Sequence, residues 1–184
     1  EFTVENQLPD TTILSGPANP TTSFGGTFRF DSNDPTVAEF ECSLDGDLFE
    51  GCQPVVFPVQ QPDSHILQEP VGPGVHRLRV RALDSEGLFD PTPAVWEWTV
   101  VMAPDTYISN APPVETTSTS ATIAFGSDQA NVTYECSLDN AAFASCGTPG
   151  NYEVELTNLS IGWHTFSVRA TDSNGFVDQT PASA

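Results

Sequence analysis

The sequence predicts an all-β chain with two tandem sandwich domains, and three observations lead to this fold class. Apolar and polar residues alternate along most segments, as they do in strands with one buried face. The 16 prolines and 13 glycines interrupt these segments, and no stretch has the period of an amphipathic helix. An internal repeat divides the chain into two units of about 90 residues, which is enough for one small core each.

Four short motifs carry the repeat. They are PDT (Pro9 and Pro104), TTS (Thr21 and Thr116), ECSLD (Glu41 and Glu135) and TPA (Thr92 and Thr180). The second copy is shorter by about six residues after its second cysteine, where a surface loop absorbs a change of length. We therefore expect the first sandwich at residues 9–103 and the second at residues 104–184, with residues 1–8 forming a separate strand and a linker.

The first four residues repeat the final segment of the first copy. EFTV (Glu1, Phe2, Thr3 and Val4) matches EWTV at residues 97–100, whereas the second copy stops at Ala184 before an equivalent segment. The second sandwich is thus expected to lack its final strand within this chain. Because proteins normally cover an exposed strand edge, we expect Glu1–Val4 to complete the second sandwich of another copy.

This reading predicts a head-to-tail partnership with further copies of the chain. Joining Ala184 to Glu1 reproduces the register of TPAVWEWTV, residues 92–100, without a gap. Covalent tandem repetition is the form that this join favours, and strand donation between separate subunits is the alternative. Both forms give an assembly that does not close on itself, which is the geometry of a fibre.

Alternating apolar residues predict the early strands of each unit. The inward residues of the first of these strands are Phe24, Gly26, Phe28 and Phe30 in the first copy and Ala121, Ile123 and Phe125 in the second. Those of the cysteine-bearing strand are Phe40, Cys42 and Leu44, matched by Tyr134, Cys136 and Leu138. Asp45-Gly46 and Asp139-Asn140 follow, and these residue types tolerate positive φ. A tight hairpin is therefore predicted after each cysteine-bearing strand.

Two later strands complete the predicted sandwich. Leu78, Val80 and Ala82 face inward between Arg77, Arg79 and Arg81, and the second copy repeats this with Phe166, Val168 and Ala170. The final strand of the first copy places Trp96, Trp98 and Val100 inward, with Glu97 and Thr99 outward. About seven short strands per unit, with a turn signal every 8 to 12 residues, predict an immunoglobulin-like or fibronectin-III-like sandwich.

The strand order of such a sandwich predicts two ion pairs. Arg81 and Arg169 face away from the core, as do Glu41 and Glu135 on the cysteine-bearing strands. Because these strands are neighbours in the sandwich, Arg81 is expected to pair with Glu41, and Arg169 with Glu135.

The four cysteines predict one disulfide in each repeat, Cys42 with Cys52 and Cys136 with Cys146. Neither pair has a second CxxC motif or the histidines of a zinc site. The alternative is four buried free thiols in a cytosolic protein. Small repeated domains with one cross-link each are typical of secreted proteins, which favours an extracellular or cell-surface location.

Several motifs in each unit together resemble a known repeat. PDTTI, FECSLDG and GVHRLRVRALDSEGLFDPTPAVWEWTV resemble the immunoglobulin-like repeat of large bacterial surface and secreted proteins. The second unit departs from this pattern at Asn140, which replaces the hairpin glycine. The resemblance implies a tandem extracellular sandwich without catalytic activity. Members of that family serve adhesion, matrix and stalk roles, so the fold leaves the function open.

The charge excludes two classes of partner. Lysine and arginine together number 5 against 25 aspartates and glutamates, which gives a net charge of −20. Such a chain repels nucleic acid and anionic membrane surfaces. No run approaches the roughly 18 to 20 apolar residues that cross a bilayer, so no membrane insertion is expected within this sequence.

The residues do not predict an enzyme, and no cofactor is expected. His76 and His164 occupy the same repeat position, in phase with the core, and a ring packed at the sandwich edge with one backbone hydrogen bond is the expected arrangement. His65 stands by itself in a polar insertion. The sequence contains no phosphate-binding loop and no HExxH motif.

Acidic residues in the turn before the final strand suggest a calcium-binding site as one interpretation. They are Asp84, Glu86 and Asp90 in the first unit and Asp172 and Asp178 in the second. Hard cations require several oxygens from one loop. An Asp-x-x-Gly turn, in which the carboxylate accepts backbone hydrogen bonds, explains the same residues, and Asn174 replaces one acid in the second copy. The ordinary turn is the preferred interpretation, and no metal is assigned.

Asn131-Val-Thr and Asn158-Leu-Ser have the form of N-glycosylation acceptors. Glycan at these two residues is thus a possible partner, depending on the organism. The function expected from the whole sequence is a structural repeat unit of an extracellular filament, stalk or adhesin shaft. The alternative is a carbohydrate-binding or accessory module of a secreted protein, which an exposed row of aromatic side chains on one sheet face would favour.

Overall fold

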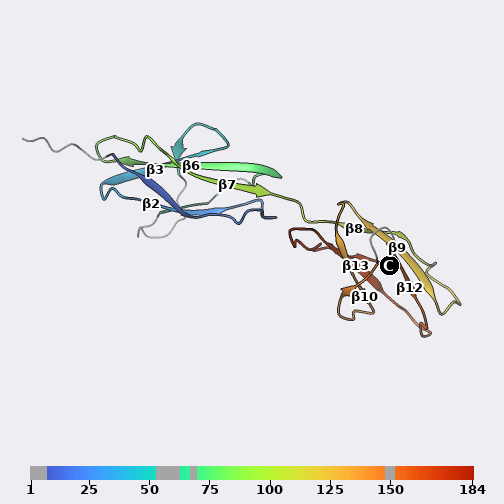
Figure 1. Ribbon diagram of the computed structural model, residues 1–184. Coiled ribbons are helices and arrows are strands. Elements are labelled where there is room, and N and C mark those ends of the chain that lie inside the picture. The colour runs from blue at the N-terminus through green and yellow to red at the C-terminus, as the bar shows by residue number, and fades with distance from the viewer. Residues whose placement is uncertain (1–7, 53–62, 67–69, 148–151) are drawn as a thin grey trace, which may run out of the picture. The chain divides into compact units, whose positions relative to one another are not determined.

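The computed structural model describes residues 8–52, 63–66, 70–147 and 152–184, with only the backbone described at 63–66. Contacts between residues divide the chain after Val101 into two compact units (Figure 1). Within the described ranges all regular elements are strands. No helix long and apolar enough to span a membrane occurs there. Glu1, Phe2, Thr3 and Val4, the predicted inter-copy strand, lie outside the described residues.

Two antiparallel sheets form the first unit. Their strands are β1 (Thr11–Ser15), β2 (Thr27–Ser32), β3 (Val37–Leu44), β4 (Glu50–Gly51), β5 (Asp63–Ile66), β6 (Gly74–Asp84) and β7 (Ala94–Val100). One sheet has the order β1-β2-β5 and the other the order β4-β3-β6-β7. The predicted neighbourhood of β3 and β6 is therefore present.

The second unit repeats this topology. Its strands are β8 (Thr106–Asn110), β9 (Ala121–Ser127), β10 (Thr133–Leu138), β11 (Ala144–Ser145), β12 (Glu153–Leu156), β13 (Phe166–Thr171) and β14 (Ala182–Ser183). The sheets have the orders β12-β9-β8 and β11-β10-β13-β14. Because both units have the same strand order, the predicted fold class, all-β with two tandem sandwiches, is confirmed. The expectation that the second sandwich lacks its final strand is wrong in part, because β14 occupies the place of β7 and pairs with β13 at Ser183 and Ala182.

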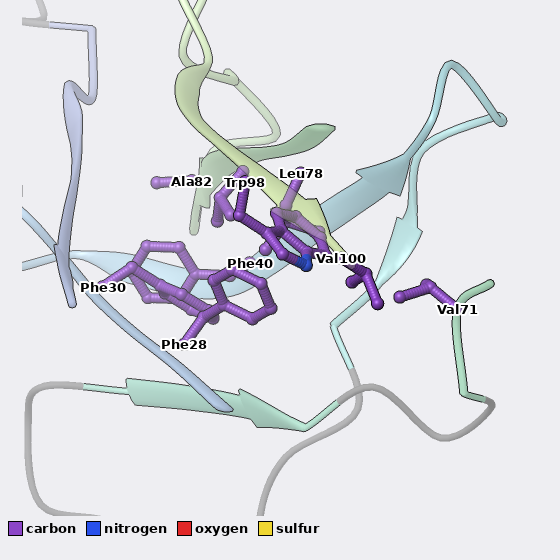
Figure 2. Packing of buried hydrophobic residues seen from close by; sticks show 9 residues of the cluster. Phe28, Phe30, Phe40, Val71, Leu78, Ala82, Trp98 and Val100 are labelled. Atoms are coloured by element: carbon purple, nitrogen blue, oxygen red, sulfur yellow. The ribbon is translucent and has the colours of Figure 1, made fainter. Parts of the chain in front are cut away.

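The core of the first unit lies between its two sheets. The buried residues are Phe28, Phe30, Phe40, Val71, Leu78, Val80, Ala82, Trp98 and Val100, which come from both sheets and one loop. Figure 2 shows the aromatic rings gathered together, with Val100 and Val71 at one end of the cluster. Trp98 is fully buried, and its ring centroid lies 5.2 Å from that of Phe28. Aromatic side chains of this size dominate the burial energy of a small core.

The core of the second unit is smaller. Its buried residues are Ile123, Phe125, Tyr134, Phe166, Val168 and Ala170. These are the inward positions that alternation predicts for β9, β10 and β13. No described residue of this unit takes the place that Trp98 has in the first, because β14 pairs with β13 over only Ala182 and Ser183.

A tight turn follows the cysteine-bearing strand in each unit, as predicted. Asp45 and Gly46 have φ values of 50° and 95°, and Asp139 and Asn140 have 52° and 61°. Asparagine is among the few side chains that tolerate this left-handed region. Asn140 therefore replaces the glycine without changing the turn.

Candidate functional site

A disulfide closes the hairpin of each unit. Cys42 is bonded to Cys52 and Cys136 to Cys146, each across a sequence separation of 10. All four cysteines are thereby paired, and the predicted pairing within each repeat is confirmed. By restricting the unfolded chain, a loop of this length contributes about 2 to 3 kcal/mol to stability.

Each unit also carries an arginine–glutamate pair on its outer face. Arg81 Nε donates to Glu41 Oε2 at 2.6 Å, and Arg169 Nε donates to Glu135 Oε2 at 2.9 Å. The strand registers place each arginine directly opposite its glutamate. Both predicted cross-strand pairs are therefore confirmed.

The same guanidinium groups cover aromatic rings. Arg81 Cζ lies 4.1 Å from the ring centroid of Phe49 and 4.4 Å from that of Phe89, and Arg169 Cζ lies 4.2 Å from that of Phe143. These are cation–π contacts. Each of these rings therefore has one face engaged by a guanidinium group.

The edge histidine of the first unit is held between a carboxylate and a carbonyl. His76 Nδ1 lies 2.8 Å from Asp45 Oδ2, and His76 Nε2 lies 2.7 Å from the carbonyl oxygen of Gly72. Burial lowers the pKa of His76, but the hydrogen bonds to Asp45 and Gly72 outweigh this effect and raise the pKa above its ordinary value. Both ring nitrogens face acceptors, so the imidazolium form satisfies both.

The second unit repeats this arrangement. His164 Nδ1 lies 2.8 Å from Asp139 Oδ2, and His164 Nε2 lies 3.0 Å from the carbonyl oxygen of Ser160. The hydrogen bond to the Ser160 carbonyl, followed by that to Asp139, raises the pKa of His164. The hydrogen bond from His164 lowers the pKa of Asp139. The sequence reading expected the backbone hydrogen bond and missed the carboxylate.

Asp139, His164 and Ser160 resemble a Ser-His-Asp triad, but their geometry does not suit catalysis. The Ser160 hydroxyl lies 3.4 Å from His164 Nε2, while the carbonyl of the same residue lies closer and accepts the Nε2 proton. Nε2 is thus engaged by the carbonyl and is not placed to take the proton of the hydroxyl, as a triad requires. In the first unit Gly72 stands in place of Ser160 with the same histidine–aspartate pair. The histidine–aspartate pair of the first unit therefore has a structural role, because glycine has no hydroxyl to act as a nucleophile.

Two of the aspartates considered as calcium ligands are buried, and their carboxylates accept hydrogen bonds from the backbone of their own unit. Asp90 Oδ2 accepts the N–H of Thr11 at 2.8 Å, and Asp178 Oδ2 accepts the N–H of Thr106 at 3.0 Å. Burial raises the pKa of Asp90, but hydrogen bonds from Thr92 and Thr11 outweigh this effect and lower the pKa below its ordinary value. These carboxylates tie the first strand of each unit to the loop before its last strand.

Asp84 and Asp172 form the alternative turn that the sequence suggested. Asp84 Oδ1 accepts the N–H groups of Glu86 and Leu88, and Asp172 Oδ1 accepts those of Asn174 and Phe176. The described residues contain no group of three or more metal-ligating side chains. The backbone of His65 pairs with that of Phe28 in the sheet.

The two glycosylation motifs lie on the surface of the second unit. Asn131 and Asn158 are exposed, and each has a φ of 59°, which places it in a turn. Exposed turns are accessible to a transferase. Glycan occupancy of these residues stays a prediction.

Among the described residues, the last strand of the second unit pairs over a shorter length than the last strand of the first unit. In the first unit β7 pairs with the start of β6, from Gly74 to Arg77. The equivalent segment, residues 162–165, has no strand beside it in the described part of the chain. Trp163 lies on this segment and is 86% exposed.

All three tyrosines gather in the second unit. The ring centroids of Tyr134 and Tyr152 are 5.2 Å apart. Burial, together with the neighbouring phenols of Tyr152 and Tyr107, raises the pKa of Tyr134. Tyr107 and Tyr152 are partly exposed. The sequence reading missed this cluster, because the three residues come from separate strands and loops.

Comparison with known proteins gives matches among solved structures only. Neither a protein-family model nor a curated protein matches the chain. The chain is similar to a segment of two fibronectin type-III domains from chicken tenascin, with 13% identity, a TM-score of 0.38, and coverage of 97% of this chain and 98% of that chain. It is also similar to the FN1–FN3 domains of chicken CNTN1, with 13% identity, a TM-score of 0.41, and coverage of 97% and 67%.

Proposed function

We propose that this chain is a structural repeat unit of an extracellular filament, stalk or adhesin shaft, assembled head to tail. One observation carries the proposal: the polar motifs that recur in both units hold the fold together. The histidine–aspartate pair, the arginine–glutamate pair and the aspartate–threonine pair recur with the same partners in each unit. Polar pairs that recur with the same partners and hold strands and loops of their own unit together suit a mechanical role.

The disulfides support an extracellular location. Each unit contains one, and such bonds persist in oxidising compartments. The link between the units is short, because only residues 101–105 separate β7 from β8, and Pro104 restricts the backbone among them. The repetition of one strand order in both units supports head-to-tail joining. The two forms of such joining are covalent tandem repetition and strand donation by another subunit.

Immunogold labelling of intact producing cells tests this function. An antibody raised against the whole chain is applied before and after permeabilisation, with a cytosolic protein as control. We expect regularly spaced label along extended structures outside intact cells. Label that appears only after permeabilisation, or that is diffuse at the cell surface without extended structures, would contradict the proposal.

A second candidate function, carbohydrate binding, is favoured by the tyrosine cluster. Tyr107 and Tyr152 present partly exposed rings close to Tyr134, and aromatic rings of this kind stack on sugars. A glycan array probed with the whole chain and with a Tyr107→Ala/Tyr152→Ala variant tests it. Binding that the variant loses would support this function, whereas equal signals from both proteins would reject it.

A further inference from the structure

We infer that the outer face of β6 in the first unit is a docking surface for the outer face of β12 in the second unit of another copy of the chain. Arg77 and Arg79 provide the cations of this contact, and Glu153 and Glu155 provide the carboxylates. All four residues lie on strands of the described part of the chain. The inference rests on the proposed function and names the surfaces through which copies associate side by side.

Three of the five arginines of the chain lie on one strand, β6. They are Arg77, Arg79 and Arg81, and they alternate with Leu78 and Val80, which are fully buried. The three guanidinium groups therefore lie on the outer face of the sheet. At a rise of about 3.4 Å per residue, successive arginines are spaced about 6.8 Å apart along the strand. In a chain with a net charge of −20, this row is a local concentration of positive charge.

Arg81 and Arg79 differ in their partners. Arg81 is paired with Glu41. Arg79 Nη2 donates to Ser43 Oγ at 3.0 Å, and Arg79 Cζ lies 5.0 Å from the ring centroid of Phe49. Among the described residues, no carboxylate forms an ion pair with Arg79. A guanidinium group has more N–H donors than one hydroxyl accepts, so Arg79 retains donors for a carboxylate from another molecule.

Arg77 is held loosely, and apolar surface lies beside the two arginines. Arg77 Nε lies 3.3 Å from Glu97 Oε1, and the two side chains are 55% and 61% exposed. Such exposed pairs are weak, so a further carboxylate can join or replace Glu97. Val95 lies opposite Arg79 and is 42% exposed, and Val75 on the same face of β6 is 73% exposed. A partner on this face would bury part of both valines.

The second unit carries the complementary charges on β12. Glu153 and Glu155 are exposed, whereas Val154 and Leu156 pack against the core. The two carboxylates thus lie on one face of the strand with the spacing of the arginines, about 6.8 Å. Neither glutamate forms an ion pair among the described residues. Because β12 is at the edge of its sheet, another molecule can reach these side chains.

The arginine pair is specific to the first unit. The registers of the cysteine-bearing strands with β6 and β13 make Ser167 the counterpart of Arg79. Asp139 donates its N–H to the carbonyl of Thr165, as Asp45 does to that of Arg77, so Thr165 is the counterpart of Arg77. The second unit therefore has hydroxyls where the first has two cations.

The glutamate pair is specific to the second unit. β12 lies beside β9 as β5 lies beside β2, and the two registers make Ser64 and Ile66 the counterparts of Glu153 and Glu155. The arginine–glutamate pairs that join neighbouring strands recur in both units, whereas these two pairs of like charges do not recur. Repeats that diverge in opposite, complementary directions suit a contact between unlike units of different copies, which continues from copy to copy without closing.

The net charge of the chain allows this contact at physiological ionic strength. Two copies repel each other over long distances, since each has a net charge of −20. At about 0.15 M salt the Debye length is about 8 Å, which screens this repulsion more than it screens charges in direct contact. At about 0.01 M salt the Debye length is about 30 Å. We therefore expect copies to associate more strongly at the higher of these two salt concentrations.

Charge reversal and its rescue test the inference on the whole chain. Sedimentation equilibrium at about 0.15 M salt compares the parent with Arg77→Glu/Arg79→Glu and with Glu153→Arg/Glu155→Arg. Each variant by itself places like charges opposite each other and should associate at least about tenfold more weakly than the parent. An equal mixture of the two variants restores opposite charges at the contact. This mixture, and one chain with all four substitutions, should associate within about threefold of the parent.

Arg29→Glu and Glu115→Arg are the matched controls, because both residues are exposed and lie outside the two surfaces. Each should change the association less than about twofold. Circular dichroism and thermal unfolding establish that every variant is folded. The rescue gives a second safeguard, because misfolded variants would not regain association when they are mixed.

Three results would overturn the inference. One is a parent chain that stays monomeric up to about 1 mM. Another is self-association that both charge reversals leave unchanged, or that neither the mixture nor the chain with four substitutions restores. The third is a sulfated polysaccharide that binds monomeric parent chains but not Arg77→Glu/Arg79→Glu, because the arginines would then serve a different partner.

Failure of this inference is distinguishable from failure of the proposed function. Extended labelled structures on cells, together with chains whose association ignores the charge reversals, would retain the structural role and reject this contact. Association that the reversals abolish and the mixture restores, without extended structures on cells, would retain the contact and reject the filament.

Discussion

Asp90 and Thr11 are joined across 79 residues of sequence by a buried hydrogen bond of 2.8 Å from the Thr11 N–H to Asp90 Oδ2. This bond connects β1, in one sheet, with the loop between the two last strands of the other sheet. Asp178 and Thr106 repeat it in the second unit. A buried carboxylate that is fully hydrogen-bonded stabilises the contact between the sheets, whereas removal of the carboxylate leaves backbone donors unsatisfied.

Asp90→Ala is expected to lower the free energy of unfolding by roughly 2 to 3 kcal/mol, because the N–H groups of Thr11 and Thr92 lose a charged acceptor. Urea denaturation followed by tryptophan fluorescence measures this loss. Asp47→Ala changes an exposed aspartate and should stay within about 0.5 kcal/mol of the parent protein. Equal effects of the two substitutions would show that the buried bond contributes nothing.

The lowered pKa of Asp90 also predicts acid sensitivity. A group whose pKa is lower in the folded state contributes stability above its unfolded pKa, which is about 3.9, and this contribution is lost as pH falls through the folded pKa. The urea concentration at the denaturation midpoint should therefore decrease as the pH is lowered from about 5 to about 2. The decrease should be smaller in Asp90→Asn. If the midpoint of the parent protein and that of Asp90→Asn decreased equally with pH, the titration of Asp90 would not explain the acid sensitivity.

His76 and His164 predict the opposite dependence at higher pH. Both have raised pKa values in the folded protein. Their stabilising effect is complete below the unfolded pKa of about 6.5 and is lost as pH rises through the folded values. The melting temperature should fall between about pH 6 and about pH 9, and the double variant His76→Gln/His164→Gln should show a flatter profile. A melting temperature that rises with pH over this range would contradict the raised pKa values of the two histidines.

Arg81 should matter more than Arg77, although both arginines lie on β6. The Arg81 side chain is 23% exposed, is paired with Glu41 and contacts the rings of Phe49 and Phe89. Arg77 is 55% exposed and pairs with Glu97. Arg81→Ala is expected to cost about 1 to 2 kcal/mol and Arg77→Ala about 0 to 0.5 kcal/mol. Guanidinium chloride would screen both pairs, so urea is the denaturant of choice.

Alternation was sufficient to predict much of this fold. The inward positions Phe28, Phe30, Leu78 and Val80 are buried as the period of two requires. Register then followed from the known order of sandwich strands, which is why the pair of Arg81 with Glu41 was predictable from sequence. The closely spaced cysteines on either side of a turn likewise allowed one pairing within each repeat.

Contacts between distant segments were not predictable in the same way. From the sequence, Asp90 fits a calcium ligand and a turn residue equally well. Nothing near it in the sequence identifies Thr11 as its hydrogen-bond partner. The sequence contains one indication that His76 pairs with Asp45, because both residues recur at matching positions in the second unit. The stacking of Arg81 on Phe49 depends on side-chain directions, which alternation does not specify.

Hydrogen exchange at the backbone amide of Thr106, followed by NMR, tests whether the recurring polar pairs hold each unit together. The Thr106 N–H donates to Asp178 Oδ2, as the Thr11 N–H donates to Asp90 Oδ2 in the first unit. Both amides should exchange slowly in the parent protein, and Asp178→Ala should speed exchange at Thr106 at least about tenfold while Thr11 stays protected. Equal protection of Thr106 in the parent protein and in Asp178→Ala would contradict the structural role of these pairs.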